Sequence, residues 1–133
     1  MILIFKILSN LTQINETIIE KLKNSHVTDI RTSIYSLDPE IHDGITKVKG
    51  SLDLTLQNLL RLKTLGLPVS ISCVLMKQNK DSYKELLKWA NTHKIPLFID
   101  YILFARYDFT SDNLDYRLSK EDIKKDIIDK NRE

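Results

Sequence analysis

Short apolar runs rich in β-branched residues alternate along this chain with stretches whose apolar residues recur at helical spacing. Strands separated by helices of 10–15 residues typically pair in parallel, with right-handed crossovers. We therefore predict an α/β fold with a parallel sheet of about four strands and crossover helices. The expected strands are Ile2–Leu8, Thr28–Ser36, Val69–Met76 and Ile95–Phe104. Helices are expected from about Asn15, over Ser51–Leu65, after Asp81 as N-cap and from Ser119.

The local signals around the second expected helix are the clearest. Ser51 is a candidate N-cap, and Gly66 suits the left-handed residue that ends a helix. Leucines at helical spacing form its apolar stripe: Leu52, Leu56, Leu59 and Leu60. Before this helix, Asp38-Pro39 and Asp43-Gly44 indicate a loop. The run Ile2–Leu8 alternates little, which predicts a strand buried on both faces.

Composition places the chain among ordinary globular proteins. With 133 residues and 42% hydrophobic content, residues 1–133 are expected to form a single domain. The formal net charge is +2, and the basic residues are interspersed with acidic ones, so no nucleic-acid partner is predicted. No apolar run approaches the roughly 20 residues of a membrane span. A secretory signal is not recognisable either, which predicts a cytoplasmic location. The abundance of isoleucine, lysine and asparagine suggests an AT-rich bacterial genome.

Neither the cysteine nor the histidines form a recognisable reactive site. The chain has one cysteine, Cys73, so it has no intrachain disulfide and no cysteine-based metal motif. Its apolar neighbours predict a buried structural thiol. The spacing of His26, His42 and His93 matches no metal-ligand pattern. No nucleophile elbow accompanies His42-Asp43, so a hydrolase is not predicted.

In parallel α/β folds, ligands bind at the carboxyl ends of the strands. The residues expected there are rich in hydrogen-bonding side chains, which suits a polar small molecule. The segments are Ser9-Asn10, Ser33–Ser36, Met76–Asn79 and Phe104–Asp108. The alternative is that these serines and asparagines only cap turns. The residue types alone leave both interpretations open.

Several of these segments resemble motifs of radical S-adenosylmethionine (SAM) enzymes of the peptide-maturase type. Five motifs occur in the family's order between about Leu3 and Glu121. They are Ser9-Asn10-Leu11, Ser33-Ile34-Tyr35-Ser36, Glu40-Ile41-His42-Asp43, Gly50-Ser51 and Phe104-Ala105-Arg106-Tyr107-Asp108. The resemblance implies that the four strands are the third to sixth of a (β/α)6 partial TIM barrel. It also implies SAM and a 4Fe–4S iron–sulfur cluster as cofactors of the parent family.

The same resemblance implies roles for individual residues. Ser33, in the segment that ends with Ser36, would touch the ribose or carboxylate of SAM, with Asn10 nearby. Many relatives carry an arginine shortly after the His-Asp pair, where this chain has Thr46 and Lys47. A lysine supplies charge there without the two-pronged guanidinium fork. The wall around the adenine would include Leu75 or Met76, with Asn79 just beyond.

The family's cluster is held by three closely spaced cysteines in the loop after the first barrel strand, and one cysteine cannot replace them. We therefore expect a fragment or truncated member of a radical SAM enzyme that modifies a peptide or similar substrate, inactive by itself. The alternative is a non-catalytic α/β interaction or scaffold module that pairs with another chain. The apolar run Ile2–Leu8 would form an uncovered sheet edge, which predicts self-association or pairing with a missing N-terminal half.

Overall fold

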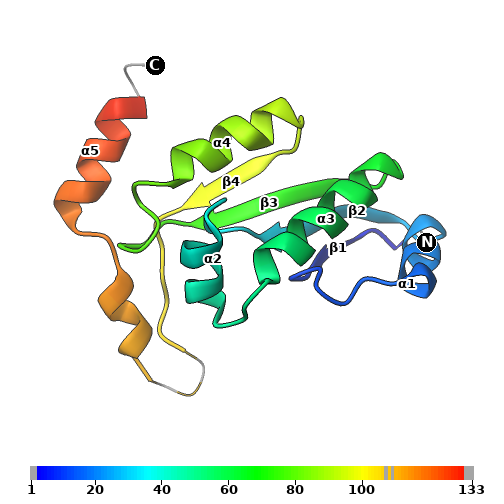
Figure 1. Ribbon diagram of the computed structural model, residues 1–133, viewed down its shortest axis with the longest axis horizontal. Coiled ribbons are helices and arrows are strands. Elements are labelled where there is room, and N and C mark those ends of the chain that lie inside the picture. The colour runs from blue at the N-terminus through cyan, green and yellow to red at the C-terminus, as the bar shows by residue number, and fades with distance from the viewer. Residues whose placement is uncertain (1–2, 107, 109, 131–133) are drawn as a thin grey trace.

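The computed structural model describes residues 3–106, 108 and 110–130. Its strands form one parallel sheet in the order β1-β2-β3-β4, which confirms the predicted α/β class. The strands are β1 (Phe5–Leu8), β2 (Val27–Ser33), β3 (Val69–Val74) and β4 (Leu97–Asp100). Figure 1 shows them side by side, with helices between successive strands.

Each pair of neighbouring strands is joined through helical segments. Helix α1 (Glu16–Lys23) follows β1, α2 (Pro39–Thr46) and α3 (Ser51–Thr64) follow β2, and α4 (Tyr83–Thr92) follows β3. After β4 come a short 3₁₀ helix, η1 (Asp112–Tyr116), and α5 (Lys120–Lys130), which lie to one side of the sheet (Figure 1). In the described part of the chain, no helix is both long and apolar enough to cross a bilayer.

The core lies between the sheet and its helices. Alternate strand residues such as Ile30 and Ile71 are buried against leucines such as Leu59 of α3 and Leu86 of α4. Burial of such a side chain contributes roughly 1.5–3 kcal/mol. The other strand residues, including Arg31 and its neighbours on β3 and β4, lie on the opposite face, where polar contacts dominate.

The segment expected to be a loop after β2 contains helix α2, so that prediction was wrong. Asp38 is its N-cap, and the Asp38 carboxylate accepts a hydrogen bond from Glu40 N at 2.8 Å. Pro39 occupies the first turn, where a missing N–H costs nothing. Asp-Pro therefore marks a helix start here, and Gly44 lies inside the helix despite its low propensity.

Helix α3 ends as predicted but begins differently. Gly66 has φ +78°, Gly66 N donates to Lys63 O at 2.9 Å, and Leu67 N donates to Leu62 O at 3.1 Å. This pattern is a Schellman ending. At the other end Gly50, also at φ +78°, is the N-cap, and Ser51 is the first helical residue.

The observed strands are shorter than the apolar runs that predicted them. Strand β2 begins at Val27 and ends at Ser33, β3 ends at Val74, and β4 covers Leu97–Asp100. The prediction that β1 is buried on both faces was wrong: Ile7 is half-buried, whereas Leu8 is 82% exposed. The reason is that β1 is an edge strand, hydrogen-bonded only to β2 among the described residues.

Helix starts elsewhere agree with the expected positions or lie close to them. Asn15 caps α1 by accepting a hydrogen bond from Ile18 N at 3.0 Å. Ser119 caps α5: its hydroxyl accepts from Asp122 N at 3.0 Å. For α4 the N-cap is Ser82 rather than Asp81, so that assignment was wrong by one residue.

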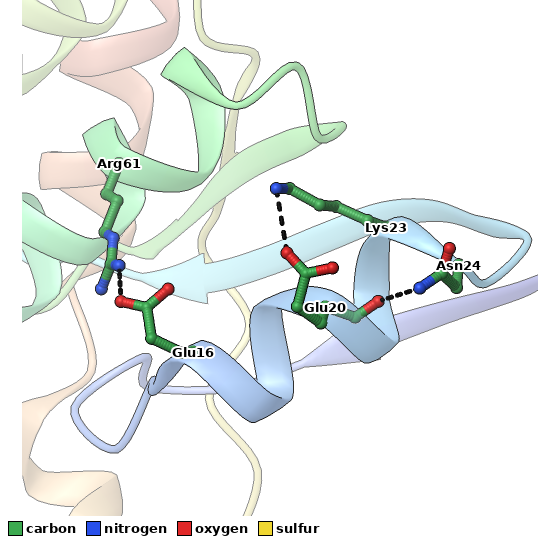
Figure 2. Close-up of polar contacts among 5 residues, drawn as sticks. All are labelled: Glu16, Glu20, Lys23, Asn24 and Arg61. Atoms are coloured by element: carbon green, nitrogen blue, oxygen red, sulfur yellow. Dashed lines mark hydrogen bonds and ion pairs between the residues drawn. The ribbon is translucent and has the colours of Figure 1, made fainter.

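Helix α1 takes part in two surface ion pairs, one with helix α3 and one within the helix itself. Figure 2 shows Glu16 of α1 paired with Arg61 of α3, and Lys23 paired with Glu20 within α1. The distance from Lys23 Nζ to Glu20 Oε1 is 3.1 Å. The Asn24 side chain donates to Glu20 O at 2.9 Å and helps to end the helix. These pairs are largely exposed, so each contributes at most about 1 kcal/mol. Of the two pairs, only Glu16–Arg61 links α1 to another helix.

Candidate functional site

A cavity of about 450 Å³ lies at the carboxyl ends of β1 and β2, against α2 and α3. Hydroxyl-bearing and amide side chains make up much of its wall. Its lining residues are Leu8, Ser9, Asn10, Thr12, Arg31, Ser33, Tyr35, His42, Thr46, Val48, Ser51, Thr55 and Ser72. This position agrees with the general rule that parallel α/β sheets bind ligands beyond their strand ends.

Two of the six predicted ligand residues line this cavity. Ser33 ends β2, and Asn10 follows β1. The carboxamide oxygen of Asn10 accepts hydrogen bonds from Thr12 N at 3.2 Å and Thr12 Oγ1 at 2.9 Å, while Asn10 O accepts from Thr55 Oγ1 at 2.9 Å. The turn after β1 is thereby attached to α3. Both side chains face a space that a polar ligand could enter.

Four other predicted ligand residues lie outside this cavity. Ser36 is fully buried, and its hydroxyl accepts from Asp38 N at 3.0 Å in the turn before α2. Leu75 and Met76 are buried just after β3. Lys47 ends α2 in the left-handed conformation, with φ 60° and an exposed side chain. The roles that the resemblance implies for these four stay predictions.

Asn79, expected just beyond the adenine wall, is completely buried. Its side-chain oxygen accepts from Met76 N at 2.7 Å, and its amide nitrogen donates to Tyr35 O at 2.9 Å and Val74 O at 3.1 Å. It therefore joins the segments that follow β2 and β3. This is a structural contact that residue type alone could not reveal.

His42 is a cavity residue that sequence reasoning did not assign to the site. It is 1% exposed, and its Nδ1 accepts a hydrogen bond from Tyr35 N at 3.2 Å. Burial disfavours the imidazolium and lowers the pKa of His42 below its ordinary value of 6.5, although neighbouring Asp43 acts in the opposite direction. The neutral ring with its proton on Nε2 is the form that fits this bond. The Glu-x-His-Asp motif pointed to this segment but did not indicate that His42 is buried in the cavity wall and accepts a hydrogen bond from Tyr35 N.

Asp43 caps the helix that follows its own. Its carboxylate accepts from Gly50 N at 2.5 Å, Ser51 Oγ at 2.9 Å and Leu52 N at 3.0 Å. Desolvation raises the pKa of Asp43, but hydrogen bonds from Leu52, Gly50 and Ser51 outweigh it, so the pKa lies below its ordinary value. The carboxylate thus accepts the free N–H groups at the start of α3. This contact holds α2 and α3 together beside the cavity.

Cys73 is a buried structural thiol, as predicted. It lies in β3 with no exposed surface, and burial raises the pKa of its thiol to about 12. A thiol with that pKa stays protonated near neutral pH and is a poor metal ligand. Among the residues that the structure describes, no group of three or more His, Cys, Asp or Glu side chains could hold a metal ion. The residues present therefore do not fit a 4Fe–4S cluster.

Comparison with known families explains the motifs around the cavity. The family model described as the Radical SAM superfamily matches residues 2–90, which is more than half of the chain. The chain belongs to the radical SAM superfamily. This finding confirms the resemblance at the level of the superfamily, and the four-stranded parallel sheet is consistent with a partial radical SAM β/α barrel. A search of curated proteins gave no match.

The matched region of this radical SAM chain includes every residue that lines the cavity. It ends within α4, so β4, η1 and α5 lie beyond it. Membership implies SAM and a 4Fe–4S cluster as cofactors of the parent family.

Proposed function

We propose that this chain forms the SAM- and substrate-facing wall of a radical SAM enzyme that modifies a peptide, and that by itself it does not start the radical reaction. One observation carries the proposal. Asn10 and Ser33, which the family motifs imply near SAM, line one cavity although they follow different strands. The superfamily match over the same residues supports a ligand of this kind at that place.

The chemistry of the cavity suits part of SAM. Hydroxyl groups such as those of Ser33 and Ser72, and the carboxamide of Asn10, can exchange hydrogen bonds with a ribose or an amino-acid group. A volume of about 450 Å³ lies in the usual range of ligand sites. Leu75 and Met76 do not line this cavity. They therefore cannot contact an adenine ring that is bound in it. We infer that the chain alone would hold SAM weakly.

The cluster must be held by thiolates other than Cys73. That side chain is enclosed in β3, and its protonated thiol is not presented to a cavity. No part of the proposed role of this chain therefore passes through an iron–sulfur cluster on its own residues. Its contribution is to bind and orient ligands at the carboxyl ends of the strands.

Titration of the chain with SAM should give weak or undetectable heat, while ligand-observed NMR at millimolar SAM should detect binding. The double substitution Asn10→Ala and Ser33→Ala should reduce that NMR signal, because both side chains line the cavity. Gln57→Ala, an exposed change on α3, is the control and should leave the signal unchanged. Anaerobic reconstitution should give neither stoichiometric 4Fe–4S absorbance nor 5′-deoxyadenosine. Submicromolar SAM binding, or a stoichiometric cluster, would contradict the proposal.

A second function, association through the sheet edge, is favoured by the exposure of β1. Leu8 of β1 is 82% exposed, and Leu3 and Ile4, just before the strand, are 71% and 65% exposed. Among the described residues, β1 pairs only with β2. Unpaired backbone groups beside apolar side chains favour addition of another strand. We propose that a second copy of this chain adds at this edge.

Light scattering at tens of micromolar should therefore show oligomers. The double substitution Ile4→Lys and Leu8→Lys should shift the population towards monomer, because charged side chains at an edge oppose strand addition. Leu54→Lys is the control, since Leu54 is an exposed leucine of helix α3 and not of the edge strand. A monodisperse monomer of the unchanged chain would refute this second function.

A further inference from the structure

Arg31 of β2 is held rigidly on the polar face of the sheet. Its Nε donates to Ser70 Oγ at 3.0 Å, and its Nη2 donates to Asp29 Oδ2 at 2.8 Å. The guanidinium carbon lies 4.0 Å from the centre of the Phe98 ring on β4. Groups from β2, β3 and β4 thus immobilise one cation. A planar guanidinium fixed in this way loses little entropy when it binds a planar anion.

The remaining edge of this guanidinium is available to a ligand. The Arg31 side chain is 27% exposed and lines the cavity, and Nη1 has no partner among the described residues. The Asp29 carboxylate does not compete for it, because its second oxygen accepts from Ser70 Oγ at 2.6 Å and Asp29 is not part of the cavity wall. The Asp29–Ser70 pair therefore orients Arg31 from behind.

The free edge of the Arg31 guanidinium favours an anion at the cavity wall, although Asp29 partly neutralises its charge from behind. Arg31 is the one charged residue among those that line the cavity in the described part of the chain, and no carboxylate lines it. Ser33 and Ser72 place hydroxyl groups on the same wall. A carboxylate is the anion whose two oxygens match the parallel N–H groups of a guanidinium.

We propose that Arg31 binds a carboxylate of the ligand that occupies this cavity. This inference rests on the proposed function and deepens it. An acidic group of a peptide substrate is one source of the carboxylate, and the amino-acid end of SAM is the other. Phe98, Asp29 and Ser70 act as positioning residues for this contact.

The test uses the full chain and ligand-observed NMR, which tolerates oligomers. The first pair of probes is N-acetylglutamic acid α-amide and N-acetylglutamine α-amide, which differ only in a side-chain carboxylate against an amide. The acidic probe should bind about tenfold more tightly, because it alone pairs with the guanidinium. Arg31→Gln should abolish this preference. Arg61→Gln, which removes an exposed arginine already paired with Glu16 (Figure 2), should keep it.

A second pair of probes, SAM and decarboxylated SAM, separates the two sources. If the carboxylate belongs to a peptide, Arg31→Gln should weaken the binding of SAM and decarboxylated SAM equally, or not at all. If it belongs to SAM, Arg31→Gln should weaken the binding of SAM alone. Either result supports the inference when the acidic probe shows its preference. Equal binding of the acidic and amide probes, no binding of either, or a preference that survives Arg31→Gln would overturn it. If the acidic and amide probes overturn the inference while SAM binding still needs Asn10 and Ser33, the proposed function stands although the inference fails.

Circular dichroism first checks that Arg31→Gln is folded. If it is not, Arg31→Lys decides the question, because a lysine keeps the charge but loses the fork. In Arg31→Lys, a preference for the acidic over the amide probe that is reduced by about threefold or more supports the inference. An unchanged preference overturns it.

Discussion

Replacing Leu59 with alanine should lower the free energy of unfolding by about 2–5 kcal/mol. Leu59 lies in the middle of α3 with no exposed surface, in the cluster that joins the helices to β2 and β3. Truncation removes buried methyl groups and leaves a cavity that the surrounding side chains fill only partly. Urea denaturation followed by circular dichroism at several protein concentrations measures the loss and separates it from any effect of association.

Leu54→Ala provides the matched control for this substitution. Leu54 belongs to the same helix but is 46% exposed. The same chemical change should there alter the free energy of unfolding by no more than about 0.5 kcal/mol. If both variants lose the same free energy of unfolding, α3 does not pack against the sheet with the face that contains Leu59.

Asn79→Ala should be the second strongly destabilising change, with a loss of about 2–4 kcal/mol, since each buried group left unpaired costs about 1–3 kcal/mol. The substitution removes the partners of Met76 N, Tyr35 O and Val74 O. Tyr35 and Met76 follow β2 and β3, and Val74 is the last residue of β3, so the carboxyl ends of the two strands should loosen. Thermal unfolding and urea denaturation both measure the effect.

The neighbouring Gln78 is the control, because its side chain is exposed. Gln78→Ala should leave stability nearly unchanged. Asn79→Asp keeps an acceptor for Met76 N but loses both donated bonds, so it should also be destabilising. If Asn79→Ala unfolds like the unchanged chain, the structural role of Asn79 is refuted.

The two substitutions bear on the cavity as well as on stability. Its walls consist of strand ends and of α2 and α3, so whatever holds these elements together also shapes the cavity. Asp43 contributes in the same way by capping α3 from α2. A ligand site of this kind depends on positioning residues that never touch the ligand.

The predictions around α2 and α3 show which helix ends can be predicted from a few adjacent residues and which cannot. Gly66 ended α3 as expected, because the left-handed conformation after a helix depends on a few adjacent residues. Asp38-Pro39 indicates a loop by its residue types, yet the same dipeptide starts a helix when the following residues pack. Ser51 was interpreted as an N-cap, but the cap is Gly50, and the carboxylate that accepts the helix N–H groups is that of Asp43.

The sequence by itself determined the α/β class, the parallel order of strands and helices, the burial of Cys73 and the placing of Asn10 and Ser33 at strand ends, because these follow from local periodicity and capping. Only the tertiary structure decided that β1 is an exposed edge, that Asn79 joins two strand ends and that Arg31 is fixed by Ser70 and Phe98. The physical reason is distance along the chain. Arg31 and Ser70 are 39 residues apart, and no local pattern encodes which distant side chains meet once the sheet has formed.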